Sequence, residues 1–305
     1  MPTLSVIVRT YDRPNLLRRA LTGILNQTVP ADELILVNNG GTPAPSAMLN
    51  EILGTKKGAL PLLTALDLPE ALSLGAAANA GLRLAKGDWV AFHDDDDVWP
   101  ATYLFETLEV LRELHPDIAL LAAPVTEVME TLTGSAEYVE TARFGLRPDI
   151  SPGILPLAKI LQSNLLPPIA LWYKREALLE VGGYAEDISV LEDWVANRAL
   201  LLKYPAWLRT GTPAEYHVRT ATAGTELPAN PEGRNTVTAK LDTHLRTHQL
   251  LLDRWLREEL ASGQFGPAMY ALLSEQQQQA IQSLREQSIA WRLIRKIRNR
   301  IRRLR

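Results

Sequence analysis

Four aspartates in a row, residues 94–97, follow an apolar run in the stretch FHDDDDVWP (92–100). Like charges repel one another, and carboxylates cannot be buried without partners. One interpretation is a solvated loop that is simply acidic. The other is a site for a divalent cation and its accompanying anions, because Mg²⁺ and Mn²⁺ take carboxylate oxygens alongside phosphate oxygens and water. A cation held in this way can stabilise the charge that develops on a departing diphosphate.

The first third of the chain predicts the elements that would position these carboxylates. Residues 4–10 are β-branched and mostly apolar, which is typical of a parallel strand covered on both faces. Strands are also predicted at 33–39, 60–66 and 88–94, and helices at 14–27, 72–85 and 100–114. Strands that alternate with helices indicate βαβ units. We therefore expect an α/β fold with a mostly parallel central sheet and helices on both faces.

Polar clusters follow three of the predicted strands. They are Thr10 to Arg13, Asn38-Asn39 and Asp94 to Asp97. In open α/β sheets, ligands bind beyond the carboxyl ends of the strands. We therefore expect the three clusters to meet at one edge of the sheet, which favours the interpretation of the aspartates as a site.

A second acidic pair, Glu192 and Asp193, lies in the first turn of a helix predicted at 191–204. Acids at a helix N-terminus are stabilised by the helix dipole, so this position alone favours a structural role. His217 lies in a predicted strand, and from the chain alone an ordinary strand histidine and a site histidine remain equally good interpretations.

The segment ATAGTELPANPEGRN (221–235) is rich in proline, glycine and polar residues and predicts a linker or long loop. We accordingly predict a catalytic domain at 1–222, a helical extension at 223–290 and a basic amphipathic tail at 291–305.

A series of motifs resembles the family 2 glycosyltransferases of the GT-A fold. The motifs are SVIVRTYDR (5–13), LLRRALTGILNQT (16–28), LVNNGG (36–41), ANAG (78–81), FHDDDDVW (92–99) and Glu192-Asp193. They follow the family's order and spacing over residues 4–220. The resemblance implies a Rossmann-like domain and an inverting transfer of a sugar from a nucleotide-diphosphate donor to a hydroxyl acceptor. That acceptor would be a glycan or lipid-linked molecule of cell-surface polysaccharide or glycolipid synthesis.

The resemblance also implies a donor site. Thr10 and Tyr11 would line the base pocket, and Asp95 would contact the ribose or the diphosphate. Asn39 stands where the family usually has an aspartate that accepts a hydrogen bond from the base. The complete expected nucleotide-sugar site is Thr10, Tyr11, Arg13, Asn39, Asn79, Asp94 and Asp95.

Three further residues receive roles in metal binding and catalysis. Asp96 matches the position that binds Mn²⁺ or Mg²⁺. His217 falls where many relatives carry a histidine near the metal and the diphosphate. Asp193 matches the general base that deprotonates the acceptor hydroxyl, and the resemblance makes this role the better interpretation of the acidic pair.

Two departures from the family pattern bear on the donor. Arg9 replaces the usual proline, and Asn38-Asn39 replaces the usual aspartate pair. An amide both donates and accepts hydrogen bonds, whereas a carboxylate only accepts them. A base other than uracil is therefore compatible with the sequence.

The charge distribution separates an acidic body from a basic tail. The net charge is −3, but WRLIRKIRNRIRRLR (291–305) carries eight basic residues and no acid. With isoleucines and leucine at heptad-like spacing, this pattern is typical of a helix that lies on an anionic membrane surface. A solvated helical end is the main alternative. Nucleic-acid binding is disfavoured because the body is acidic.

Composition indicates a cytoplasmic protein at the cytoplasmic face of the membrane. The chain has no cysteine, which excludes disulfides and thiolate metal sites. Neither a signal peptide at the start nor an apolar run long enough for a membrane span is expected. We therefore predict that the protein is a metal-dependent glycosyltransferase. The rival from another class is a catalytically idle nucleotide-sugar-binding module that scaffolds polysaccharide assembly.

Overall fold

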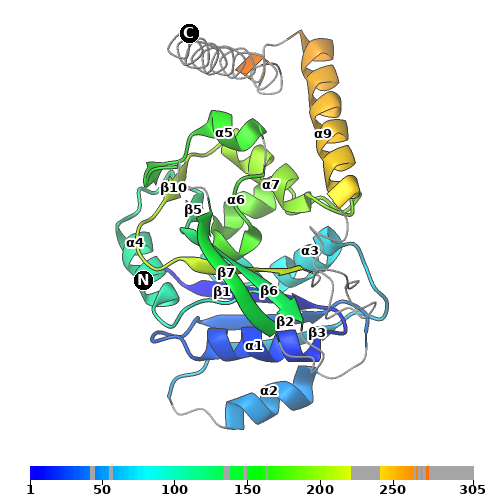
Figure 1. Ribbon diagram of the computed structural model, residues 1–305. Coiled ribbons are helices and arrows are strands. Elements are labelled where there is room, and N and C mark those ends of the chain that lie inside the picture. Colours follow the sequence, from blue (N-terminus) through cyan, green and yellow to red (C-terminus); the bar gives the residue numbers. More distant parts are fainter. Residues whose placement is uncertain are drawn as a thin grey trace, which may run out of the picture. The chain divides into compact units, whose positions relative to one another are not determined.

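The computed structural model describes residues 1–41, 45–54, 58–132, 138–146, 150–162, 164–220 and 241–263, with 266, 269, 273 and 274 (Figure 1). The chain divides into two compact units, Met1–His248 and Gln249–Arg305. The first unit has a mixed α/β architecture built on a large, mostly parallel sheet, as the sequence predicts.

The central sheet has eight strands in the order β3-β2-β1-β4-β9-β5-β10-β8. These are β1 (Leu4–Thr10), β2 (Glu33–Asn38), β3 (Leu62–Asp67), β4 (Trp89–Asp94), β5 (Leu120–Ala122), β8 (Gly153–Ile154), β9 (Leu171–Lys174) and β10 (Ala206–Leu208). Strands β3, β2, β1 and β4 are mutually parallel, whereas β9 is antiparallel to both its neighbours. The run from β3 to β4 therefore places four strand ends along one edge.

Helices follow the strands of this sheet. They are α1 (Pro14–Leu25), α2 (Pro45–Gly54), α3 (Leu74–Leu84), α4 (Tyr103–Glu113), α5 (Leu157–Gln162), α6 (Arg175–Glu180) and α7 (Glu192–Leu201), with the 3-10 turn η1 (Pro168–Ala170). Pro14 lies in the first turn of α1, where its missing N–H costs nothing, and the hydroxyl of Ser73 caps α3 by accepting from the Ala76 N–H. The apolar face of α1, from Leu16 to Ile24, is buried.

A second sheet of three strands was not predicted from the sequence. It runs in the order β11 (Ala214–Thr220), β6 (Val125–Leu132), β7 (Tyr138–Leu146), with β6 and β7 antiparallel. An isolated antiparallel bridge joins Val98 to Glu215 and so ties β11 to the segment after β4. This bridge brings β11 to the aspartates.

In the second unit the structure describes the continuation of α9 (Leu241–Ser262). Residues 221–240, which contain the predicted domain boundary at 222, lie outside the described residues. The predicted tail 291–305 lies outside them too. Among the helices that the structure describes, none is both long and apolar enough to cross a bilayer.

The close approach of α3 to the loop before α7 requires a glycine. A Cβ on Gly75 would lie 1.9 Å from the carbonyl oxygen of Ala185. We expect Gly75→Ala to lower the free energy of unfolding by about 1–3 kcal/mol, because backbone must move to admit the methyl group. Urea unfolding measures the loss. Gly54→Ala is the matched control, since a Cβ at this exposed helical position meets nothing within 4 Å. Equal stability of the two variants would contradict the close approach.

Candidate active site

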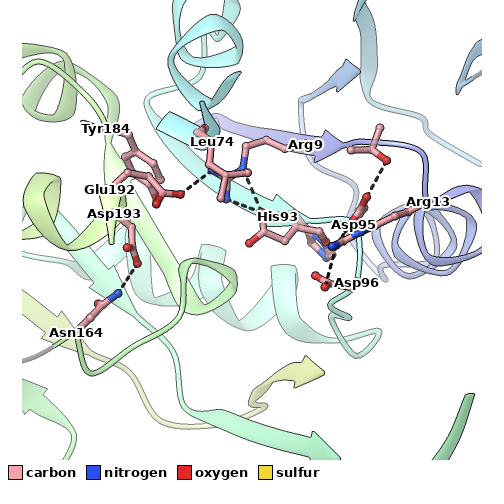
Figure 2. Close-up of polar contacts among 12 residues, drawn as sticks. Arg9, Arg13, Leu74, His93, Asp95, Asp96, Asn164, Tyr184, Glu192 and Asp193 are labelled. Carbon is pink, nitrogen blue, oxygen red and sulfur yellow. Dashed lines mark hydrogen bonds and ion pairs between the residues drawn. The ribbon is translucent and has the colours of Figure 1, made fainter. Parts of the chain in front are cut away.

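The three aspartates that follow β4 are buried rather than solvated, whereas Asp94, the last residue of the strand, is partly exposed. Asp95, Asp96 and Asp97 expose at most 8% of their surface. Asp95 accepts hydrogen bonds from the Thr10 hydroxyl (2.8 Å) and from Arg13 Nη1 (3.1 Å) (Figure 2). Burial raises the pKa of Asp95 to about 6, against the lowering effect of Arg13. The clusters after β1 and β4 therefore meet, as the sequence predicts.

The negative charge of Asp96 is compensated by two arginines, more than for any other aspartate of the cluster. Its Oδ2 accepts from Arg219 Nη2 (2.5 Å) and from Arg13 Nη1 (3.2 Å). Burial alone would raise the pKa of Asp96, but Arg219 and Arg13 outweigh it and lower the pKa to about 2. Asp96 is therefore ionised at neutral pH.

Asp97 serves a structural contact. Its Oδ1 accepts from the backbone N–H of His217 (2.9 Å), which fixes β11 beside the cluster. Burial and the neighbouring Asp96 and Asp94 raise the pKa of Asp97 well above its usual value.

Thr10 and Asn38 lie side by side at the ends of β1 and β2, and Asp67 ends β3 in the same register. Asn38 donates to Asp67 Oδ1 (2.9 Å). The amide of Asn39 closes on the backbone of Leu72, donating to its carbonyl (3.1 Å) and accepting from its N–H (2.9 Å). Asn39 thus lies in the predicted region, with its side-chain amide engaged by the protein itself.

Tyr11 and Asp12 form the turn that follows β1. Tyr11 is exposed, and Asp12 has a φ of 50°, a left-handed conformation that is uncommon for a residue other than glycine. Backbone strain of this kind concentrates at functional sites, and this turn leads directly to Arg13. The position of Tyr11 is compatible with the predicted contact to a base.

The side-chain hydrogen bonds of Asn79 go to residues other than the aspartate cluster. Its amide donates to the Tyr184 carbonyl (2.8 Å) and to Glu186 Oε1 (2.8 Å), and it accepts from the Tyr184 N–H (2.9 Å). These bonds anchor α3 to the loop that precedes α7. Its predicted donor contact stays a prediction.

Asp193 begins α7 and is 5% exposed. Asn164 Nδ2 donates to its Oδ2 (2.7 Å), and Leu191 before the pair has a φ of 66°. Burial, together with the adjacent Glu192, raises the pKa of Asp193 to about 7. A dipole-stabilised surface acid would have a low pKa, so this environment argues against the purely structural interpretation.

His217 is surrounded by carboxylates. Its Nδ1 lies 2.8 Å from Glu130 Oε1, and its Nε2 lies 3.8 Å from Glu215 Oε2. Burial lowers the pKa of the imidazole, but Glu130 and Glu215 outweigh it and raise the pKa. An imidazole must be neutral to ligate a cation. This environment argues against the predicted metal role, which stays untested.

Sequence reasoning missed several cationic and amide partners. Arg219 contacts the carboxylate of Asp96, Arg19 donates to the backbone carbonyl of Asp96, and Asn164 donates to Asp193. Arg219 had one available signal, because it follows His217 by two residues and so lies on the same face of β11. Arg9 was noted only as a departure from the family pattern.

The site offers a divalent cation one protein ligand, the carboxylate of Asp96. Both arginines contact Oδ2 of Asp96, which leaves Oδ1 of an ionised carboxylate for a hard cation. Within the described ranges, no three His, Cys, Asp or Glu side chains are grouped as in an all-protein metal cage. Mg²⁺ is commonly held by one or two carboxylates plus substrate phosphates, so Asp96 suits that mode.

A family model, Glycosyl transferase family 2, matches residues 5–163. The chain belongs to this family. A curated relative is the UDP-Gal:alpha-D-GlcNAc-diphosphoundecaprenol beta-1,3-galactosyltransferase of Escherichia coli, which is 26% identical over 68% of this chain and 68% of its own length. The amylovoran biosynthesis glycosyltransferase AmsE of Erwinia amylovora is 33% identical over 41% of this chain and 46% of its own. The match spans 44% and 59% of two uncharacterized Haemophilus influenzae glycosyltransferases.

Two solved structures share the fold. The mannosyltransferase PcManGT of Pyrobaculum calidifontis, in complex with GDP-Man and Mn²⁺, aligns with a TM-score of 0.54 at 20% identity, over 92% of this chain and 81% of its own. TarS of S. aureus, in complex with UDP-GlcNAc, aligns with a TM-score of 0.55 at 19% identity, over 73% and 61%. The GT-A fold is thereby confirmed.

The raised pKa of Asp193 predicts a pH-dependent stability. Between its unfolded value near 3.9 and about 7, the folded state binds more protons, so this group stabilises the fold at low pH and destabilises it as pH rises through 7. We expect Asp193→Asn to be more stable than the parent at pH 8, by at least about 1 kcal/mol, with the difference vanishing towards pH 4. Urea unfolding across this pH range measures it, and a difference independent of pH would contradict the assignment.

Proposed function

We propose that this protein is an inverting glycosyltransferase that moves a sugar from a nucleotide-diphosphate donor to a hydroxyl acceptor. The observation that carries the proposal is Asp193, a buried carboxyl with a pKa of about 7. Arg9 connects its neighbour Glu192 to Asp94 at the end of β4 (Figure 2). A general base works best when its pKa lies near the operating pH.

The reaction requires one proton transfer and two bond changes at the anomeric carbon. Asp193 takes the proton of the acceptor hydroxyl as the hydroxyl oxygen attacks the anomeric carbon. Attack comes from the face opposite the diphosphate, so the bond from carbon to the diphosphate oxygen breaks while the new glycosidic bond forms. Configuration at the carbon inverts, and Asp193 ends the step protonated.

The leaving group carries its negative charge towards the arginines of the site. Arg13 and Arg219, which converge on Asp96, supply positive charge on the donor side. Asp96 would hold Mg²⁺ or Mn²⁺, which when bound supplies further compensation for a diphosphate. In support, the PcManGT structure, which has the same fold, contains Mn²⁺ with GDP-Man.

We propose the class of donor, a nucleotide sugar, from the structural relatives. The identity of its nucleobase is not specified by them. TarS and PcManGT bind UDP-GlcNAc and GDP-Man respectively. Asn39 stands where the family usually offers a nucleobase a carboxylate, and its amide is engaged by the backbone of Leu72. We therefore include guanine and adenine nucleotides as candidates alongside uridine.

The acceptor and the place of action are proposed from relatives and from the sequence. AmsE and the succinoglycan biosynthesis protein ExoW of Rhizobium meliloti carry names from polysaccharide synthesis, and the Escherichia coli relative is named for a diphosphoundecaprenol substrate. We propose a glycan or lipid-linked acceptor and action at the cytoplasmic face of the membrane, with 291–305 as the surface contact.

Replacing the proposed general base, Asp193, separates the effect on catalysis from the effect on donor binding. We expect Asp193→Asn to bind donor nearly as well as the parent and to transfer sugar at least ~10²-fold more slowly, the lower end of general-base effects. Glu176→Gln is the matched control, because Glu176 is an exposed acid in the first turn of α6. Single-turnover transfer and donor titration measure the two effects. Full turnover in Asp193→Asn would refute the role of Asp193 as general base. Donor binding without transfer by the parent over a broad acceptor panel would favour the idle binding module.

The metal assignment rests on Asp96. We expect Mn²⁺ to increase the thermal stabilisation given by a nucleoside diphosphate in the parent and to have no such effect in Asp96→Asn, because an amide oxygen is a weaker ligand for a hard cation. A panel of UDP, GDP, ADP and CDP with and without Mn²⁺ also identifies the base. Asp117→Asn, at an exposed position, is the control. A full metal-dependent shift in Asp96→Asn would refute the assignment.

A further inference from the structure

Arg9 is a buried cation at the end of a central strand. Its side chain is 6% exposed and lies next to the last residue of β1. Nε and Nη2 contact Asp94 Oδ1 (3.1 and 2.5 Å), while Nη1 lies 3.2 Å from the Leu74 carbonyl and 3.4 Å from Glu192 Oε1 (Figure 2). One guanidinium therefore contacts β4, α3 and α7.

These contacts join the two acidic groups of the site. Asp94 is the first aspartate of the cluster, and Glu192 directly precedes the proposed base. The two acids are nearly a hundred residues apart in sequence, and the fork of Arg9 spans them with a planar, always charged group. Lysine could not reproduce such a contact, because its ammonium is a single point charge on a flexible chain.

The surroundings of Asp193 give this cation an electrostatic role. Among the described residues, the groups that act electrostatically on Asp193 or are affected by it come from several elements: Glu192 on its own helix, Asn164 after α5, Tyr173 of β9, Tyr184 after α6, Tyr216 of β11 and Arg9 of β1. Arg9 is the cation among them. Two adjacent buried carboxyls repel each other, and a nearby positive charge allows both to ionise.

We propose that Arg9 is a positioning residue that ties Glu192 to Asp94 and thereby sets both the orientation and the ionisation of Asp193. The proposal rests on the function proposed above for Asp193 as general base. It gives a role to the arginine that replaces the proline usual in this family. The donor side and the acceptor side of the reaction are then connected through a single side chain.

The test reads the charge of Asp193 directly and needs no substrate. Protein labelled with ¹³C at aspartate side-chain carboxyls is titrated by NMR, and Asp193→Asn assigns the signal. We expect Arg9→Gln to raise the pKa of Asp193 by ~1 unit or more, the usual effect of losing an opposite charge nearby. Arg9→Lys should leave the pKa nearly unchanged. Arg9→Gln combined with Glu192→Gln should return it towards the parent value, because one charge of each sign is then removed.

A matched arginine controls for lost stability. Arg209 is fully buried, and its Nη1 lies 3.4 Å from Oε2 of Glu106, which is 30% exposed, so Arg209→Gln also removes a buried arginine from an ion pair without touching Asp193. The pKa of Asp193 should stay constant in this variant. If Arg9→Gln does not fold, the double variant, whose buried charge is balanced, is compared with Glu192→Gln alone. The pKa of Asp193 must then be higher in the double variant.

Kinetics supply the second arm. Arg9→Lys should lower kcat while the KM for donor changes little, because charge is kept and the fork is lost, and Arg9→Gln should shift the acidic limb of the pH–kcat profile upward. A pKa of Asp193 that is the same in all Arg9 variants overturns the inference. A pKa that moves as expected in a protein that transfers no sugar upholds the coupling and instead refutes the proposed function.

Discussion

Carboxylates at the inner end of a central strand can stay buried only where positive charge is brought to them. Strand β4 ends in such carboxylates, and arginines meet them from three directions. Arg9 comes from β1, Arg13 from the turn that follows it, and Arg219 from β11. Removing one partner from a buried pair costs far more than the pair contributes. The rest of the first unit is therefore constrained to deliver these side chains.

The position of β11 follows from this constraint. Its strand returns beside the aspartates, where Asp97 accepts the His217 N–H and Val98 bridges to Glu215. Pairing of β11 with β6 then presents Arg219 to Asp96. The matched family segment ends at residue 163, yet the site needs residues from beyond it on both β11 and α7. The second sheet thus completes the site that the βαβ segment begins.

Sequence could predict the parts of the fold that local pattern determines. Strands β1 to β4 and helix α3 lie within two residues of their predicted ranges, because buried parallel strands and amphipathic helices have periodic signatures. Hairpin β6–β7 and the short strands β8 and β10 were missed. For β8 and β10, pairing with strands distant in the sequence outweighs local propensity. The acids of the site were visible from residue type and order. Of their arginine and amide partners only Arg13 was predicted; Arg219 and Asn164 were not, because contacts between residues far apart in the sequence, 123 residues for Arg219 and Asp96, leave little local trace.

The positions of the arginines make the pKa values of the buried aspartates in the candidate site differ from one another. Asp96 has two guanidinium groups and a pKa of about 2, so it remains a fixed negative charge throughout the neutral range. Asp95 shares one guanidinium with Asp96, and its pKa rises to about 6. Asp193 receives an amide hydrogen bond from Asn164 and the charge of Arg9 nearby, but the guanidinium of Arg9 contacts Glu192 rather than Asp193, and the pKa of Asp193 reaches about 7. Environments that separate the pKa values of chemically identical groups are how one fold assigns binding and proton transfer to different carboxyls. A carboxyl paired with arginines is too weak a base to take a proton from a hydroxyl. Within the described part of the chain, Asp97 and Asp193 are not paired in this way, but Asp97 holds the backbone N–H of His217, so Asp193 is the acid that we propose takes the proton.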